Sequence, residues 1–155
     1  MKSKMTERVL TFRQAVEAKP DIADGYQLGL QALGANSNKI VAANTRKLDG
    51  SVDIDTCTKE KYPEENRWDY AIGYDGNVYF VEVHPASAAE VRVVLQKLQW
   101  LKAWLQKEAP EINKKKANFP YYWVQTGSFQ IPKNSRQNFA AAAAHIRPVL
   151  SVPLP

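Results

Sequence analysis

Cysteine is nearly absent from this sequence of 155 residues, which contains only Cys57. A single cysteine forms no internal disulfide, and without a cluster of other ligands it makes no metal site. Long apolar runs are absent too, since no stretch approaches the roughly 18 apolar residues of a membrane span. The charged residues 1–8 are not followed by the apolar region of a secretion signal. We therefore expect a soluble, cytoplasmic protein with no membrane partner.

Several catalytic motifs are also missing. The sequence contains no Gly-rich phosphate loop, no Ser-His-Asp arrangement with a recognisable spacing, and no internal repeat beyond two predicted Asp-Gly hairpins. The length predicts one domain over residues 1–155, and 45% hydrophobic and 10% aromatic residues are enough to form a core. The function therefore has to be inferred from charge and from the placement of single residues.

Acidic residues are missing from the end of the chain. Residues 117–155 hold three basic residues and no acidic one, and residues 87–116 hold seven basic and three acidic residues. Residues 49–69, in contrast, hold seven acidic and three basic residues. This pattern fits a cation-binding centre within a phosphate-binding surface. An ordinary solvated surface is the alternative, and charge by itself favours it.

The stretch 67–84 predicts the central β-hairpin. Two runs rich in aromatic and β-branched residues flank Asp75-Gly76, a dipeptide that suits a two-residue type I′ turn. The turn fixes the register and pairs Tyr70 with Val81 on an apolar face.

The other face of this hairpin contains a candidate site. The same register sets Asp69 opposite Glu82 and Arg67 opposite His84. Two like charges directly opposite each other destabilise a sheet. A bound cation, or a cationic side chain reaching over the pair, would remove this penalty.

A second hairpin is predicted over residues 39–58, with Asp49-Gly50 as its turn. Its register sets Arg46 opposite Asp53. Because that pairing is favourable, Asp53 needs no metal to explain it.

Helices are predicted on both sides of these hairpins. They cover residues 4–18, residues 26–33 with Gly34 as the C-cap, and residues 136–146. Ser87 and Glu90 have the form of a capping box before a long helix that runs to about Lys107. A buried strand follows at residues 121–127, beside the hairpin after a crossover, and residues 149–155 are expected to be extended or frayed.

Trp100 and Trp104 form an apolar patch on one side of the long helix. We expect them to pack against the C-terminal segment. A homodimer or another protein partner that contacts both tryptophans is the alternative.

The order of elements resembles the PD-(D/E)XK nuclease superfamily. A helix, antiparallel strands, a helix and a further strand are predicted, with Asp69 on one strand and Glu82-Val83-His84 on the next. The resemblance covers about residues 5–126 and leaves residues 127–155 as a C-terminal helix and tail. It implies an α/β fold of the α+β type, with a restriction-endonuclease-like αβββαβ core whose central mixed sheet of antiparallel hairpins is flanked by helices.

The resemblance also implies roles for single residues. Asp69 and Glu82 would hold Mg²⁺ or Mn²⁺, with Glu17 of the first helix as a further ligand. His84 stands where the family has a lysine, and it would orient or deprotonate the attacking water. Lys97 or Arg92 of the following helix could supply the missing catalytic cation, although Arg92 cannot act as a base. Nucleic-acid contacts are expected from the basic residues Lys114, Lys115, Lys116, Lys133 and Arg136.

Three functions remain open at this point. The first is a metal-dependent nuclease, and the second is a nuclease-like module that has lost catalysis and binds nucleic acid or a protein. The third is a mixed domain of another function, in which Asp69 and Glu82 are solvated or pair with Arg67.

Overall fold

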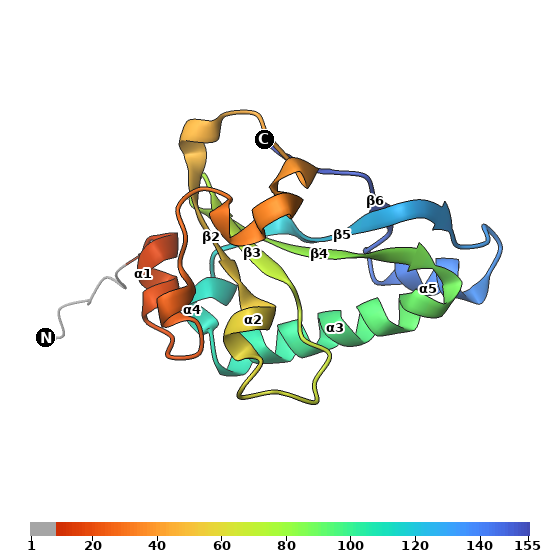
Figure 1. Ribbon diagram of the computed structural model, residues 1–155, viewed down its shortest axis with the longest axis horizontal. Helices are drawn as coiled ribbons and strands as arrows, with labels where there is room; N and C mark the ends of the chain where they lie inside the picture. The colour runs from red at the N-terminus through yellow and green to blue at the C-terminus, as the bar shows by residue number, and fades with distance from the viewer. Residues whose placement is uncertain (1–8) are drawn as a thin grey trace, which may run out of the picture.

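The computed structural model describes residues 9–155, and a five-stranded mixed sheet lies at its centre (Figure 1). The strand order is β2-β3-β4-β5-β6, and β1 and β7 form a separate two-stranded sheet. The strands are β1 (Ile40–Ala42), β2 (Leu48–Asp53), β3 (Tyr70–Tyr74), β4 (Asn77–Ser87), β5 (Lys116–Gln130), β6 (Pro148–Val149) and β7 (Val152–Leu154). The helices are α1 (Phe12–Glu17), α2 (Ile54–Thr58), α3 (Ala88–Lys107), α4 (Pro110–Asn113) and α5 (Arg136–Ala143), with 3₁₀ turns at Ala23–Gly25, Gln31–Lys39 and Thr45–Lys47.

The central hairpin has the predicted register. Strands β3 and β4 pair antiparallel, with Tyr74 opposite Asn77 and Tyr70 opposite Val81. The turn residues Asp75 and Gly76 have φ values of 51° and 80°. A type I′ turn requires a positive φ at both of its central residues, so the dipeptide set the register as expected.

The crossover after the hairpin is also as predicted. Strand β4 leads into α3, and β5 returns parallel to β4, with Glu82 opposite Trp123. Because β2 pairs antiparallel with β3, the chain has the predicted order of helix, three antiparallel strands, helix and parallel strand. The predicted mixed sheet flanked by helices is therefore confirmed.

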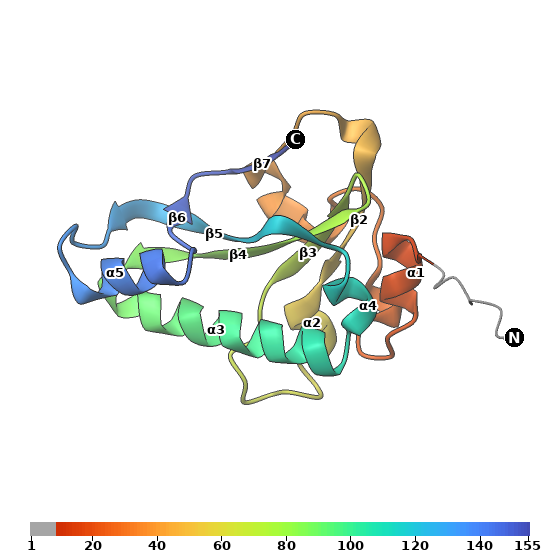
Figure 2. The same cartoon turned by 180° about the vertical axis from the view of Figure 1, so that it is seen from behind.

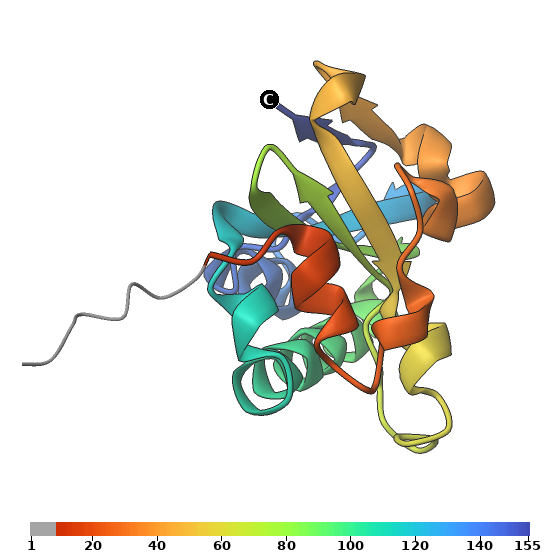
Figure 3. The same cartoon turned by 90° about the vertical axis from the view of Figure 1, so that its left-hand side faces the viewer.

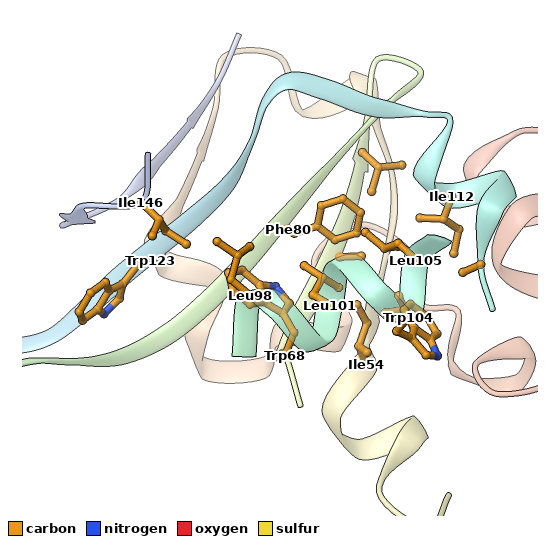
Figure 4. Packing of buried hydrophobic residues seen from close by; sticks show 14 of the residues in the cluster. Ile54, Trp68, Phe80, Leu98, Leu101, Trp104, Leu105, Ile112, Trp123 and Ile146 are labelled. Atoms are coloured by element: carbon orange, nitrogen blue, oxygen red, sulfur yellow. The ribbon is translucent and has the colours of Figure 1, made fainter. Parts of the chain in front are cut away.

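Each face of the sheet is covered by a different part of the chain. Helices α1, α3, α4 and α5 pack on one face, around core residues such as Trp68, Phe80 and Leu101 (Figure 4). The segment of residues 30–42 and the C-terminal strand β7 cover the opposite face. Figures 2 and 3 show the same layers from behind and from the side. Side chains alternate along a strand, so Glu82 shares the α3 face with Phe80.

The second predicted hairpin is wrong. Asp49 and Gly50 lie inside β2, which pairs with β3 through an irregularity between Leu48 and Gly50. The ring of Tyr26 packs over Gly50 (φ 140°), where a Cβ atom would lie 2.4 Å from it, and its hydroxyl donates to the carbonyl of Asp49 at 2.6 Å. Asp53 does not face Arg46 but caps α2, where its Oδ1 accepts the Thr56 N–H at 2.9 Å. Tertiary pairing thus overrides the local turn signal.

The first two predicted helices also need correction. Within the described residues, α1 begins only at Phe12, because Thr11 forms a capping box with Gln14. The predicted start, residues 4–8, lies outside the described part of the chain. Residues 26–30 are not helical, and a 3₁₀ turn over Gln31–Lys39 instead contains Gly34 in a left-handed conformation (φ 55°).

The long helix has the predicted bounds but not the predicted cap. Ser87 is its N-cap residue, yet no side-chain hydrogen bond caps the helix. Of the two expectations for residues 149–155, extended or frayed, the extended one is right, because β7 pairs parallel with β1 and buries Val152 and Leu154. The C-terminal tail is therefore part of the core.

Trp100 and Trp104 were predicted to pack against the C-terminal segment, but their contacts are elsewhere, and Trp104 is buried. Trp104 is 4% exposed, and its Nε1 donates to Asp21 Oδ2 at 3.1 Å. Trp100 stacks on Trp104 and meets the edge of Tyr62, with ring centroids 5.8 and 5.6 Å apart. The N-terminal segment and the loop before β3 thus cover this side of α3, and Trp104 has no free face for a partner.

Across residues 9–155, none of the helices combines the length and the apolar character that a membrane span requires.

Candidate functional site

Asp69 and Glu82 meet at the open end of the central hairpin, where the predicted register set them. Asp69 directly precedes β3, and Glu82 lies within β4. Glu82 Oε1 accepts the Asp69 N–H at 3.1 Å, and Asp69 Oδ2 accepts the Val83 N–H at 2.9 Å. The carbonyl of Asp69 also accepts the Ile54 N–H at 2.8 Å. These bonds fix both carboxylates to the backbone of the neighbouring element.

Lys97 brings a cation to this pair from α3. Its Nζ lies 2.5 Å from Glu82 Oε2. Glu82 is completely buried, and the side chain of Lys97 is 18% exposed. Because Glu82 points toward α3, a lysine on the inner flank of that helix can reach it. The structure thus contains the cationic side chain that the opposed carboxylates required.

His84 lies between two carboxylates. Its Nδ1 is 3.4 Å from Glu82 Oε2, and its Nε2 is 3.4 Å from Glu90 Oε2. The indole Nε1 of Trp123 donates to the His84 carbonyl at 3.0 Å, which holds this part of β4 against β5. Glu90 was predicted as part of a capping box, so sequence reasoning missed its place beside the histidine.

Arg67 does not face His84, contrary to the predicted register. Its Nε bonds Asp55 Oδ1 at 2.8 Å, and its Nη1 donates to the carbonyl of Tyr62 at 2.7 Å. The reason is that the strand begins only at Tyr70, so Arg67 lies in the preceding loop and turns toward α2. Asp69 and Glu82 are therefore compensated by Lys97 and not by Arg67.

The pKa values of the site reflect burial and mutual repulsion. Burial, followed by the nearby Glu82 carboxylate, raises the pKa of Asp69 to about 7. Contact with Glu82 raises the pKa of His84 above its ordinary value, against the opposing effect of burial. Burial alone would lower the pKa of Lys97, but the Glu82 carboxylate more than offsets it, and that pKa is raised. The site therefore holds its lysine charged and its aspartate close to half-protonated at neutral pH.

A hydrogen bond next to this site joins helix α3 to the loop that precedes β3. Asn66 Nδ2 donates to Gln96 Oε1 at 2.8 Å. Gln96 precedes Lys97 on α3, so the bond holds the helix close to the segment that carries Asp69.

The structure does not bring the other predicted site residues to this cluster. Glu17 lies at the end of α1, where its carboxylate pairs with Arg13 Nε at 3.3 Å. Among the described residues, no interaction joins it to Asp69 or Glu82, so the structure does not bring Glu17 to the pair. The predicted nucleic-acid contacts are dispersed, because Lys114 and Lys115 lie in the turn before β5, Lys116 opens β5, Lys133 lies in the loop before α5, and Arg136 opens α5.

The donor set fits a hard cation only in part. Carboxylate oxygens are the ligands that Mg²⁺ and Mn²⁺ prefer. Within residues 9–155, however, no group of three or more His, Cys, Asp or Glu side chains could hold a metal ion. Asp69 and Glu82 would therefore provide two protein ligands, and waters or substrate oxygens would complete the coordination sphere.

Comparison with known proteins adds no functional assignment, since family models, curated proteins and solved structures all give no significant match to this chain. The function is therefore argued from the geometry of the site. Two carboxylates that share one buried position with a lysine can bind a divalent cation, or can form a closed structural ion network.

Proposed function

We propose that this protein is nuclease-like, related to the PD-(D/E)XK superfamily, and acts on nucleic-acid phosphodiesters with Mg²⁺ or Mn²⁺. The observation that carries the proposal is the convergence of Asp69, Glu82 and Lys97 from the start of β3, from β4 and from α3. The motif that carries the resemblance, two acids on a hairpin, is short. A lysine from the following helix, reaching the same carboxylate, supplies the cation that His84 does not.

The chain's own residues have distinct roles in this proposal. Asp69 and Glu82 would hold the metal ion, which when bound lowers the pKa of a water and neutralises charge on the phosphate. Lys97 is kept protonated beside Glu82, so it would stabilise developing negative charge and would not act as a base. His84 would orient or deprotonate the attacking water, a role that imidazole side chains often have, and its contact with Glu82 raises its pKa.

A second candidate is a non-catalytic nucleic-acid- or protein-binding module on the same fold. It is favoured by the state of Glu82, which is completely buried and whose two oxygens both face protein donors. A metal ion would have to compete with Lys97 for this carboxylate. In that case the cluster would be an ion network that holds β3, β4 and α3 together.

A cleavage assay separates the two candidates. Purified protein is incubated with duplex DNA, single-stranded DNA and RNA in the presence of Mg²⁺, Mn²⁺ or EDTA. A nuclease cleaves one of these substrates only with the metal ion, and the activity is lost in Asp69→Asn and in Glu82→Gln. Asp75→Asn is the matched control, because Asp75 is an exposed carboxylate in the turn of the same hairpin. Intact substrates under all conditions would rule out the enzyme and leave the binding module.

A further inference from the structure

A polar cleft lies where the start of β5 passes between α3, α4 and the end of α5. It consists of two adjoining cavities of about 400 and 250 Å³, which share Lys102, Asn118, Pro120 and Tyr121. Asn113 and Lys116 line the larger cavity, and Phe119 and His145 line the smaller one. Within residues 9–155, no aspartate or glutamate lines either cavity, so the cleft presents positive charge, amides and aromatic rings.

No carboxylate of the described part of the chain pairs with either of the two lysines of the cleft. The Nζ of Lys102 lies 5.2 Å from the centre of the Tyr121 ring, and the Nζ of Lys116 donates to Asn113 Oδ1 at 3.2 Å. Among residues 9–155, neither lysine has a recorded ion pair. A cation held by an aromatic face and a cation held by an amide both keep their full charge for a ligand.

The aromatic residues of the cleft differ in their contacts and in their exposure to solvent. Tyr121 stacks on Phe80, with ring centroids 5.7 Å apart, and is fixed in the core layer. Phe119, two residues earlier on β5, is 79% exposed. A large apolar ring exposed beside uncompensated lysines is an arrangement that suits the stacking of a base whose phosphates contact the cations.

The cleft is separate from the acid cluster. Lys97 and Lys102 lie five residues apart on α3, about 7.5 Å along its axis and about 140° around it. Lys97 faces β4, whereas Lys102 faces Tyr121 of β5. The two sites therefore lie on different flanks of α3, and binding in the cleft does not require the carboxylates Asp69 and Glu82.

We propose that this cleft binds a single-stranded nucleic-acid segment, with Lys102 and Lys116 on its phosphates and Phe119 stacked on a base. This inference goes beyond the proposed phosphodiester chemistry and stands without it. A duplex keeps its bases stacked inside and offers no free base face to Phe119, so the cleft favours single strands.

Fluorescence anisotropy in EDTA tests the proposal, with a labelled single-stranded DNA of about 12 nucleotides as the probe. The Lys102→Gln/Lys116→Gln variant should bind at least about tenfold more weakly at about 50 mM salt. The slope of log Kd against log salt should fall by about 1.4, because each phosphate contact on a single strand contributes about 0.7. Phe119→Ala should weaken binding by about tenfold and leave that slope unchanged.

The matched control is Lys107→Gln, which removes an exposed lysine of α3 that lines neither cavity. It should bind like the unaltered protein, and circular dichroism should show that every variant is folded. Because binding is measured in EDTA, without a metal ion, failure of the proposed metal site would leave this result unchanged. The proposal is overturned if the unaltered protein does not bind, if the lysine variant binds normally, or if Phe119→Ala has no effect. Equal displacement of the probe by poly-glutamate or by duplex DNA would overturn it as well.

Discussion

At the scale of single residues, the fully buried Glu82 carboxylate dominates the site. A buried charge is tolerated only when donors and an opposite charge surround it. Glu82 receives the Asp69 N–H and the ammonium of Lys97 and lies 3.4 Å from the His84 imidazole. These contacts stabilise the buried carboxylate when no metal ion is bound, and a metal ion would have to rearrange them.

Lys97 should therefore be required for stability as well as for any activity. Lys97→Met leaves the buried Glu82 carboxylate without its cation, and we expect a loss of roughly 3–5 kcal/mol in the free energy of unfolding. Glu82→Gln in the same chain should restore part of this loss, because the amide oxygen still accepts the Asp69 N–H. Urea unfolding of the two single variants and the double variant measures the coupling. Additive losses would contradict a direct Lys97–Glu82 interaction.

Asp69 should make stability depend on pH. Its folded pKa of about 7 exceeds the ordinary value of 3.8, so the folded protein binds this proton more tightly than the unfolded chain. The resulting stabilisation is fully present below about pH 4 and is lost as the pH rises through 7. Asp69→Asn keeps an acceptor for the Val83 N–H and removes the charge. We therefore expect a gain on the order of 4 kcal/mol near pH 8, a smaller gain of about 1–2 kcal/mol near pH 5, and little change only below about pH 4.

Thermal unfolding of the Asp69→Asn variant at both pH values measures this difference. Asp75→Asn in the exposed turn is the control, and it should show no comparable dependence on pH. A gain of equal size at both pH values would mean that the charge of Asp69 is not the cause.

At the scale of elements, predictions from the sequence were right where short-range interactions determine the structure, and wrong where contacts between distant segments determine it. The central hairpin was predicted with its register because the Asp75-Gly76 turn is a local signal. The same dipeptide at Asp49-Gly50 gave a wrong prediction, because pairing with β3 and the ring of Tyr26 determine the conformation there. Burial of the C-terminal tail was missed for a related reason, since β7 pairs with β1, more than one hundred residues earlier.

Gly50 should be one of the least replaceable residues of the sheet. Gly50→Ala imposes strain at a φ of 140° and places a Cβ atom 2.4 Å from the Tyr26 ring. We expect a loss of roughly 2–4 kcal/mol from backbone strain and overpacking together. Gly76→Ala is the matched control, because Gly76 also has a positive φ but has no neighbouring atom within 4 Å of such a Cβ. Chemical denaturation should show the smaller loss, about 1 kcal/mol, at Gly76.

At the scale of the whole molecule, the candidate site lies where three elements meet, namely the start of β3, β4 and α3. The hairpin register predicted that Asp69 and Glu82 would meet, because strand pairing can be derived from a turn. Lys97 was named through the resemblance, but its orientation toward Glu82 depends on how α3 packs on the sheet, which no local pattern specifies. The distance of Glu17 from the pair could not be predicted for the same reason, since α1 packs on another part of the sheet, where Phe12 contacts Gly73.

Coupling between metal and proton binding follows from this assembly. If Asp69 and Glu82 hold a divalent cation, the metal ion must displace the proton that Asp69 carries below about pH 7. Stabilisation by Mn²⁺ should therefore increase from about pH 5.5 to pH 8, and reach about 2.7 kcal/mol when the free ion is at one hundred times its Kd. Differential scanning calorimetry with Mn²⁺ and with EDTA at each pH measures the effect. The Asp69→Asn/Glu82→Gln variant should lose it, whereas Asp75→Asn should retain it. An increment in unfolding temperature that persists in the double variant would place the ion elsewhere on the protein, and no increment at any pH would favour the closed ion network held by Lys97.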